Sequence, residues 1–178
     1  MTAQAKIRIG TRGSELALWQ ARHVAGLLGA ESTEIVIIKT KGDRIQNVSF
    51  DKMEGKGFFT KEIEDALLAG TVDLAVHSFK DLPTEPAPGL EVAAITRREN
   101  PSDILLIAEA AYQGSRYLPL ADGAAVGTSS LRRAAQLLHE NPSLRVEALR
   151  GNVTTRVRKL REGAFDAIVI AFAGLSRL

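Results

Sequence analysis

Cysteine is absent from this 178-residue sequence, and that absence alone excludes several classes of protein. Without a thiol the chain has no disulfide framework, no thiolate metal site and no cysteine nucleophile. Histidine occurs only three times, at scattered positions, so a histidine-rich metal site is not expected either. We therefore predict a protein without a metal centre.

Long apolar runs are also missing. No stretch approaches the roughly eighteen residues that a membrane-spanning helix needs, and residues 1–6 lack the apolar core of a signal peptide. The 23 basic and 21 acidic side chains nearly cancel, and the net charge of +2 argues against a general binder of polyanions. With 45% hydrophobic residues the chain is long enough to bury a core. We predict a cytoplasmic globular protein that binds neither nucleic acid nor membrane.

The charges are unevenly divided along the chain. Residues 1–100 carry a net charge of −1 and residues 101–178 one of +3, and nine of the ten basic residues in the second part are arginine. The planar guanidinium group matches carboxylate or phosphate well. Two interpretations stay open here, an anion-binding surface in the second part or a solvated basic face.

The hydrophobic pattern of the first half alternates between strands and helices. Ser14 is expected to begin one helix that runs to about residue 28, and Thr60 another that runs to residue 68. A glycine-punctuated stretch between them, residues 42–57, is long enough to suggest a functional loop. The predicted strands cover residues 6–11, 34–40, 72–79 and 90–95, and a proline-rich loop covers 80–89.

The second half repeats this order of elements after a polar hinge at residues 96–103. Strands are predicted at 104–107, 124–128, 145–149 and 165–171, and helices at 130–140, 153–162 and from 172 onwards. Each half thus follows the order β-α-β-α-β, which implies parallel sheets with helices on their faces. We predict an α/β fold of two doubly wound β-α-β domains, residues 1–98 and 99–178, with a cleft between them.

Polar side chains gather where the predicted strands run into helices. The four junctions are residues 11–14 (TRGS), 78–81 (SFKD), 127–130 (GTSS) followed by Arg132 and Arg133, and 150–152 (RGN) followed by Arg156. Helix N-termini converge there in open sheets and favour anions. One such junction is explained by helix capping, but four, three of them with arginine, favour a ligand with several anionic groups. Nucleotide phosphate is less favoured because neither GxxxxGK[ST] nor GxGxxG occurs.

Asp81 is the acidic exception among these cationic junctions. Its carboxylate is suited to holding a cation or moving a proton, and the alternative is a turn-forming aspartate before Leu82 and Pro83. Lys80 is either part of the site or a solvated charge. Phe59 has two interpretations as well, a core anchor or a ring that packs against a flat ligand.

Six segments together resemble one family, porphobilinogen deaminase, also called hydroxymethylbilane synthase. VHSFKDLPT and the pair GTSSLRR and LRGNV are the most specific of its motifs. The match follows the chain in order and covers almost all of it, in TRGSELALWQA (11–21), EGKGFFTKEIEDALL (54–68), DLAVHSFKDLPTE (73–85), GTSSLRRAAQL (127–137), LRGNVTTRVRKL (149–160) and DAIVIAFAGLSRL (166–178).

The resemblance implies an architecture similar to type II periplasmic binding proteins for the first two domains, with a third domain beyond them. It implies a transferase of porphyrin and haem biosynthesis that condenses four porphobilinogen molecules, with release of ammonia, into the linear tetrapyrrole hydroxymethylbilane. The implied partners are porphobilinogen and the growing polypyrrole, whose acetate and propionate groups are anions. A monomer is expected at full length.

The resemblance also assigns residues by their positions in the motifs. Asp81 is the implied catalytic carboxylate, which holds pyrrole N–H groups and stabilises the cation left by ammonia. Substrate binding is assigned to Arg12, Ser14, Phe59 and Arg177, and the covering loop to Lys52 and Lys56. The dipyrromethane cofactor and the growing chain are assigned to Lys80, Asp81, Thr128, Ser129, Ser130, Arg132, Arg133, Arg150, Gly151 and Arg156. Domain 1 is thus the substrate side and domain 2 the arginine-rich cofactor side.

One departure from the family concerns the tether of the cofactor. Family members attach dipyrromethane through a thioether to a cysteine of the third domain, and this sequence has none. It stops at Leu178 in an apolar run without a helix-stop signal. We expect a fragment, inactive alone, that lacks the third domain and the return segment of domain 1; a natural short form is the alternative.

A non-catalytic module, with two lobes closing on a small carboxylate, is the rival class. Asp81 beside Lys80 favours the enzyme, because a pure carboxylate binder has no use for an acid in its cleft.

Overall fold

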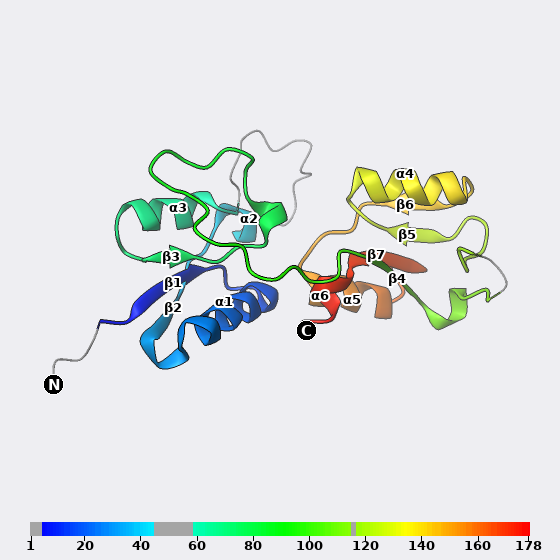
Figure 1. The fold of residues 1–178 in the computed structure, drawn as a ribbon. Coiled ribbons are helices and arrows are strands. Elements are labelled where there is room, and N and C mark those ends of the chain that lie inside the picture. The colour runs from blue at the N-terminus through cyan, green and yellow to red at the C-terminus, as the bar shows by residue number, and fades with distance from the viewer. Residues whose placement is uncertain (1–4, 45–58, 115–116) are drawn as a thin grey trace. The chain divides into compact units, whose positions relative to one another are not determined.

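The computed structural model describes residues 5–44, 59–114 and 117–178, and the chain divides into two compact units, Met1–Thr96 and Arg97–Leu178 (Figure 1). Each unit is an α/β fold with its own sheet. Within the described residues no helix has the length and apolar character needed to cross a membrane.

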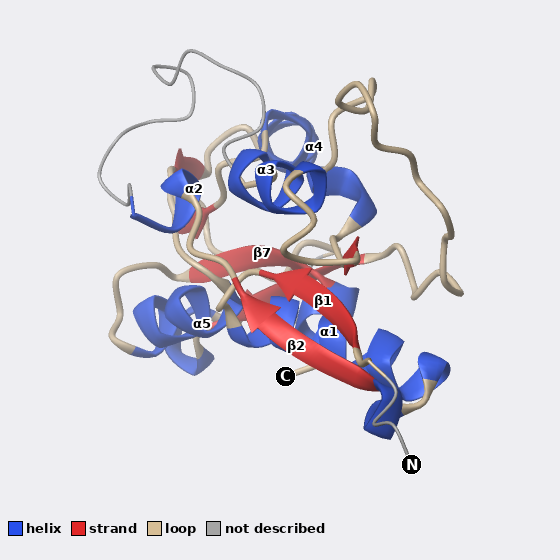
Figure 2. Ribbon diagram, turned by 90° about the vertical axis from the view of Figure 1, so that its left-hand side faces the viewer, coloured by secondary structure: helices blue, strands red, loops and turns tan. Residues whose placement is uncertain are grey.

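The first unit is built on a parallel three-stranded sheet in the order β2-β1-β3. Its strands are β1 (Ile7–Thr11), β2 (Thr33–Ile37) and the short β3 (Leu74–Ala75). Helices α1 (Glu15–Leu28) and α3 (Lys61–Leu68) lie on opposite faces of the sheet, and α2 (Lys41–Arg44) follows β2 (Figures 1 and 2). Short 3-10 helices cover Ala30–Ser32 and Phe79–Asp81.

Helix α1 begins and ends where its sequence specifies. The Ser14 hydroxyl accepts a hydrogen bond from the Ala17 amide at 3.3 Å, and Gly29 ends the helix with φ of 95°. Ala21 and Ala25 of the helix pack on Ile9 of β1, so small side chains let the helix lie close to the sheet. This packing fixes the start of α1 beside the end of β1.

The second unit has a four-stranded sheet in the order β4-β7-β5-β6. Its strands are β4 (Asp103–Ile107), β5 (Ala125–Gly127), β6 (Arg145–Glu147) and β7 (Ala167–Ala171). The helices are α4 (Leu131–Glu140), α5 (Val153–Arg161) and α6 (Phe172–Leu175), with a 3-10 helix at Glu109–Ala111. Strands β5, β6 and β7 are parallel, whereas β4 runs antiparallel to β7.

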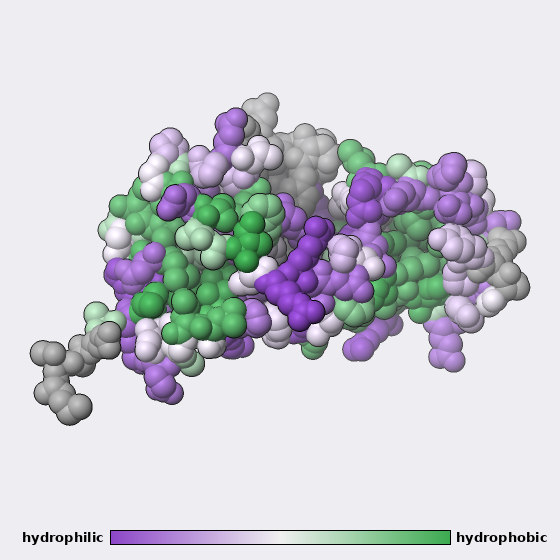
Figure 3. Space-filling view, in the orientation of Figure 1, coloured by the Kyte–Doolittle hydropathy of each residue, from purple (hydrophilic) through white to green (hydrophobic). Residues whose placement is uncertain are grey.

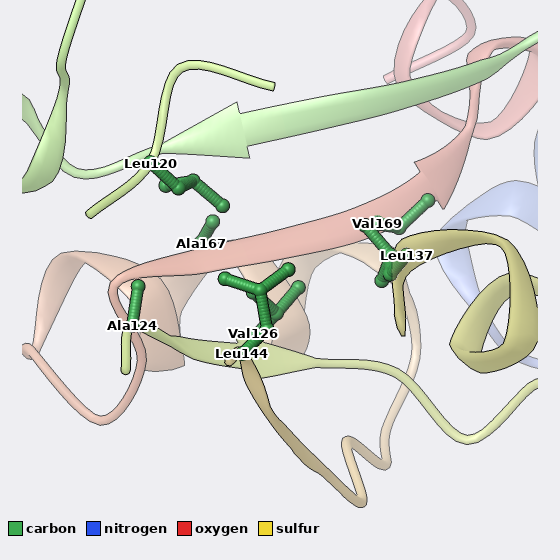
Figure 4. Packing of buried hydrophobic residues seen from close by; sticks show 7 residues of the cluster. All are labelled: Leu120, Ala124, Val126, Leu137, Leu144, Ala167 and Val169. Carbon is green, nitrogen blue, oxygen red and sulfur yellow. The ribbon is translucent and has the colours of Figure 1, made fainter. Parts of the chain in front are cut away.

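Strand β7 is buried on both faces, which explains its continuous apolar sequence. Ala167 and Val169 belong to a cluster with Leu137 of α4 (Figure 4). Ile168 and Ile170 point the other way, into a cluster with Leu160 of α5. The two clusters lie on opposite faces of the sheet, each between the sheet and a helix that covers it.

Three sequence predictions differ from the structure. The predicted strand 72–79 shrinks to Leu74–Ala75, because the chain leaves the sheet and forms the 3-10 helix Phe79–Asp81. The predicted strand 90–95 is wrong, because no strand among the described residues pairs with it. Val92 and Ile95 are 48% and 69% exposed, on a unit whose surface is partly apolar (Figure 3). The sheet of the second half is not wholly parallel, because its edge strand β4 pairs antiparallel with β7.

Truncation of β7 tests whether the second unit depends on its doubly buried strand. We expect Ile168→Ala to lower the free energy of unfolding by about 2–5 kcal/mol, because the removed atoms leave a cavity in a close-packed core. Chemical denaturation measures this value. Leu131→Ala is the matched control, since Leu131 is 89% exposed, and an equal loss in both variants would contradict the core assignment.

Candidate functional site

In the first unit, a pocket lies at the carboxyl edge of the parallel sheet. It is lined by the segment between β1 and α1 and by the segment that follows β3, the two junctions predicted from the sequence. Its polar lining comprises Arg12, Ser14, Gln20, His77, Ser78 and Asp81, and the ring of Phe59 is among its apolar members.

Arg12 is held by an aromatic ring rather than left to sample solvent. Its guanidinium carbon lies 4.2 Å from the centre of the Phe59 ring, a cation–π contact. Phe59 stands two residues before α3, so the ring brings the start of that helix to the β1–α1 junction. The stacked guanidinium is half-buried and fixed in place at the pocket.

A hydrogen-bonded pair ties the two junctions together. The Ser78 hydroxyl lies 3.0 Å from Nε2 and 3.1 Å from Oε1 of Gln20, which comes from the second turn of α1. Ser78 precedes the 3-10 helix that carries Lys80 and Asp81, and its carbonyl accepts from the Asp81 amide at 2.9 Å. Gln20 therefore fixes the segment of Asp81 against α1, and nothing in the sequence pattern had singled it out.

His77 is a second member of the pocket that sequence analysis missed. Burial lowers its pKa, the charges of Asp81 and Glu64 oppose that shift, and the charge of Arg12 adds to it. The net result is a pKa below the ordinary value, so the imidazole is neutral at neutral pH. A neutral imidazole can accept a hydrogen bond or a proton inside the pocket.

Asp81 and Lys80 are both exposed, but only Asp81 lines the pocket in the described part of the chain. The carboxylate of Asp81 and the guanidinium of Arg12 thus border one pocket with opposite charges. Such a pair can bind a ligand that carries a carboxylate at one end and a cation at the other.

The hydroxyl cluster after β5 is engaged in local structure. Ser130 caps α4 by accepting from the Arg133 amide, at 3.5 Å, and Thr128 Oγ1 accepts from the Ser130 amide at 3.2 Å. The Ser129 hydroxyl donates to the Leu149 carbonyl at 2.9 Å and so links the ends of β5 and β6. These bonds position the first turn of α4, which carries Arg132 and Arg133.

One carboxylate holds both of those arginines. Arg132 Nη2 lies 2.8 Å from Asp103 Oδ2, and Arg133 Nη2 lies 2.6 Å from Asp103 Oδ1. Burial raises the pKa of Asp103, but the hydrogen bonds from Arg133 and Arg132 outweigh it and bring the pKa below its ordinary value. Arg133 also donates to the Val169 carbonyl at 3.2 Å. Sequence analysis missed Asp103, which lies 30 residues from its partner.

The junction after β6 adds further cationic groups to the second unit. Asn152 caps α5 by accepting from the Thr155 amide at 2.8 Å, and Gly151 adopts a φ of 112° that other residues rarely take. Arg156 Nε donates to the Gly151 carbonyl at 2.8 Å. Burial lowers the pKa of Arg156, and the positive charge of Arg133 lowers it further. Arg133 and Arg156 therefore belong to one cationic patch at this edge of the sheet.

The remaining predicted residues are less informative. Arg150 is half-buried at the end of β6, and its carbonyl accepts from Lys159 at 3.3 Å. Arg177 is half-buried after α6. Lys52 and Lys56 lie outside the described residues.

The fold and these junctions define an α/β protein that carries guanidinium groups at the carboxyl ends of its parallel strands. A family model described as "Porphobilinogen deaminase, dipyromethane cofactor binding domain" matches residues 7–178. The chain therefore belongs to the porphobilinogen deaminase family.

Two relatives named porphobilinogen deaminase illustrate the similarity. That of Maridesulfovibrio salexigens is 55% identical over 177 residues, and that of Syntrophomonas wolfei is 51% identical over 176. Each alignment covers 97% of this chain but only 56% of the relative, so the chain spans about half the length of the curated relatives it matches. Among solved structures, the periplasmic VFT2 domain of BvgS from Bordetella pertussis aligns with a TM-score of 0.45 and 14% identity, over 97% of this chain and 68% of that one.

Neutralising Asp103 tests its role as the anchor of both arginines. We expect Asp103→Asn to lower the free energy of unfolding by about 1–2 kcal/mol, because Arg133 keeps a buried charge without its anion. The folded-state pKa is depressed, so the stabilisation is full above the unfolded pKa near 3.8 and is lost as the pH falls through the lower folded value.

Denaturation of wild type and Asp103→Asn at pH 6 and pH 3 measures both effects. The gap between the two proteins should narrow at the lower pH. Glu109→Gln, an exposed acid of the same unit, should show neither effect. A gap that is equal at both pH values would contradict the ion-pair account.

Proposed function

We propose that this chain supplies the catalytic pocket and the cofactor-binding surface of a porphobilinogen deaminase. The reaction joins four porphobilinogen molecules head to tail and releases one ammonia per unit added, and water then releases the tetrapyrrole as hydroxymethylbilane. Family membership supports this proposal, and the observation that carries it is the pocket bordered by both Arg12 and Asp81. Porphobilinogen has the matching chemistry, with two carboxylates and an aminomethyl group on one pyrrole ring.

Substrate binding falls to the residues of the β1–α1 junction. We infer that Arg12 and Ser14 bind a side-chain carboxylate of porphobilinogen, because a guanidinium held on a ring keeps its N–H donors available in a fixed direction. Phe59 then borders the pyrrole as well as the guanidinium. Arg177 is proposed as a further carboxylate ligand on the strength of the family motif.

Asp81 is proposed as the catalytic residue. Its carboxylate would accept hydrogen bonds from pyrrole N–H groups and stabilise the positive charge that develops when the C–N bond breaks and ammonia leaves with its electron pair. The new C–C bond then forms at the free α-carbon of the neighbouring pyrrole, which loses its proton. We propose His77, whose imidazole lines the same pocket and is neutral because burial lowers its pKa, as the acceptor of that proton.

The second unit fits the anionic side chains of dipyrromethane. Arg133 Nε is buried and has no hydrogen-bond acceptor among the described residues, and Arg133 and Arg156 repel each other. A carboxylate between such groups would satisfy a donor and relieve the repulsion. We propose that Lys80, Thr128, Ser129, Ser130, Arg132, Arg133, Arg150, Gly151 and Arg156 contribute to binding of the cofactor and the growing chain.

The dipyrromethane, when bound, supplies the pyrrole α-carbon to which substrate units are added. Its attachment is a separate matter from its binding, because none of the 178 residues is a cysteine. We propose that the thiol belongs to another part of a longer protein, and that a cytoplasmic monomer of that length is the active form.

Replacement of Asp81 tests the proposed catalysis. The assay uses a full-length chimera in which this chain is followed by the remaining C-terminal part of the Maridesulfovibrio salexigens relative. We expect Asp81→Asn to reduce turnover by a factor of about 10² to 10⁴, because the developing cation loses its counter-charge. Ammonia release and hydroxymethylbilane formation measure it, and the melting temperature should stay unchanged.

Glu85→Gln is the matched control, an exposed acid from the same loop that does not line the pocket. It should keep wild-type turnover. A turnover of Asp81→Asn within about fivefold of wild type would contradict the proposed catalytic role of Asp81. Tight binding of porphobilinogen without any turnover in the wild-type chimera would instead favour a non-catalytic binding module.

The chain by itself provides a test of the tether. Purified as 178 residues, it should give the mass of the bare polypeptide, since no thiol is present to form the thioether, and it should consume no porphobilinogen. Intact mass spectrometry and a porphobilinogen depletion assay measure the two outcomes, with the chimera as the positive control. Steady formation of hydroxymethylbilane by the 178-residue chain would show that the tether is dispensable.

A further inference from the structure

Phe59 is in contact with a second segment besides Arg12. A side-chain carbon built on Gly42, in α2, would overlap the Cδ1, Cε1 and Cζ atoms along one side of the ring. The backbone of α2 therefore occupies the place where a side chain would otherwise stand. Phe59 is wedged between this backbone and the guanidinium of Arg12, 4.2 Å from the ring centre.

The contact between α2 and the ring is fixed by a hydrogen bond nearby. Glu62, in the first turn of α3, accepts from the Lys41 amide at 2.9 Å. Lys41 immediately precedes Gly42, and Glu62 follows Phe59 by three residues, so this bond sets the distance between the two. Thr60, between Phe59 and α3, is fully buried, so the chain next to the ring is part of the interior.

The backbone conformation of Gly42 does not itself demand glycine. Gly42 lies in a helix, and it is not among the described glycines with positive φ, which are 29, 70, 89, 123, 151 and 163. Alanine is the better helix former, so backbone energetics alone favour alanine there. The ring is what a side chain at this position would meet, so either the ring or the backbone of α2 would have to move to accept one.

We propose that Gly42 is a positioning residue for the substrate-binding arginine: its missing side chain seats the Phe59 ring, and the ring holds Arg12 at the pocket. This inference rests on the proposed function in one respect, that Arg12 binds a carboxylate of porphobilinogen. The physical link from Gly42 to Arg12 through the ring is independent of it.

Gly42→Ala and Gly26→Ala form a matched pair of variants. Gly26 lies in α1, and a side-chain carbon there would meet nothing within 4 Å. Gly26→Ala should keep or raise the melting temperature and leave Arg12 unaffected. Gly42→Ala should displace the Phe59 ring, although the substitution and the helical context are the same.

Nuclear magnetic resonance of the 178-residue chain measures directly whether the ring of Phe59 stays beside Arg12. The Nε–Hε resonance of Arg12 feels the ring current of Phe59, and Phe59→Leu defines its position without the ring. In Gly42→Ala the resonance should move toward that of Phe59→Leu, and in Gly26→Ala it should stay at the wild-type value. A wild-type resonance in Gly42→Ala would overturn the inference.

Steady-state kinetics of the full-length chimera measure the effect of the same substitution on substrate binding. Gly42→Ala should raise KM for porphobilinogen by about three- to thirtyfold, the range expected for loss of one cation–π contact, while kcat changes less than about twofold. Because both substitutions act through one ring, the Gly42→Ala/Phe59→Leu double variant should match Phe59→Leu alone. Fully additive effects, or a fall in kcat with KM unchanged, would overturn the inference.

Two further outcomes separate the possible failures. A wild-type chimera that does not turn over porphobilinogen would contradict the proposed function, and the Arg12 resonance would still decide the inference. If Gly42→Ala alone does not fold, the double variant decides: without the ring it should fold, and its failure to fold would show that Gly42 meets something other than Phe59.

Discussion

The carboxyl ends of parallel strands lie at one edge of a sheet. The positions of the charged side chains of this protein depend on that geometric constraint. In the first unit, β1 and β3 pair side by side, so Arg12 and Asp81, 69 positions apart in the sequence, border one pocket. In the second unit β5 and β6 pair in the same way, and the segments after them carry Arg133 and Arg156. The sheets contribute the apolar cores and, to these sites, one charged group, Asp103 at the start of β4, whereas the arginines stand on the segments that follow the strands.

Each cationic group is restrained by a partner of a different kind. Arg12 stacks on a phenyl ring, Arg132 and Arg133 share one carboxylate, and Arg156 donates to a backbone carbonyl. These contacts use part of the hydrogen-bonding capacity of each guanidinium and reduce its rotamer freedom, which lowers the entropic cost of binding an anion. Within the second unit, Arg132, Arg133 and Arg156 are restrained in this way on one sheet, which suits the binding of an anionic group there.

Local sequence patterns were sufficient for much of the fold. The strand Ile7–Thr11, the cap at Ser14 and the doubly buried β7 follow from alternation, capping chemistry and apolar composition, which are properties of neighbouring residues. The pairing of Asp103 with Arg133, the burial of His77 and the contact of Gly42 with Phe59 depend on segments that meet only after folding. The predicted strand 90–95 failed for the same reason, because a strand exists only where another strand accepts its hydrogen bonds.

The antiparallel ladder of β4 and β7 has a mechanical consequence. Asp103, the first residue of β4, pairs with Ala171, the last of β7, and the Phe172 amide donates to the Ser102 carbonyl at 2.9 Å. Tension between the linker before Ser102 and the chain after Phe172 would therefore pull on one end of the ladder and open its hydrogen bonds one pair after another. Asp103 stands at that end, and its two arginines fasten it to α4. The same carboxylate that orders the arginines thus resists peeling of the edge strand under load.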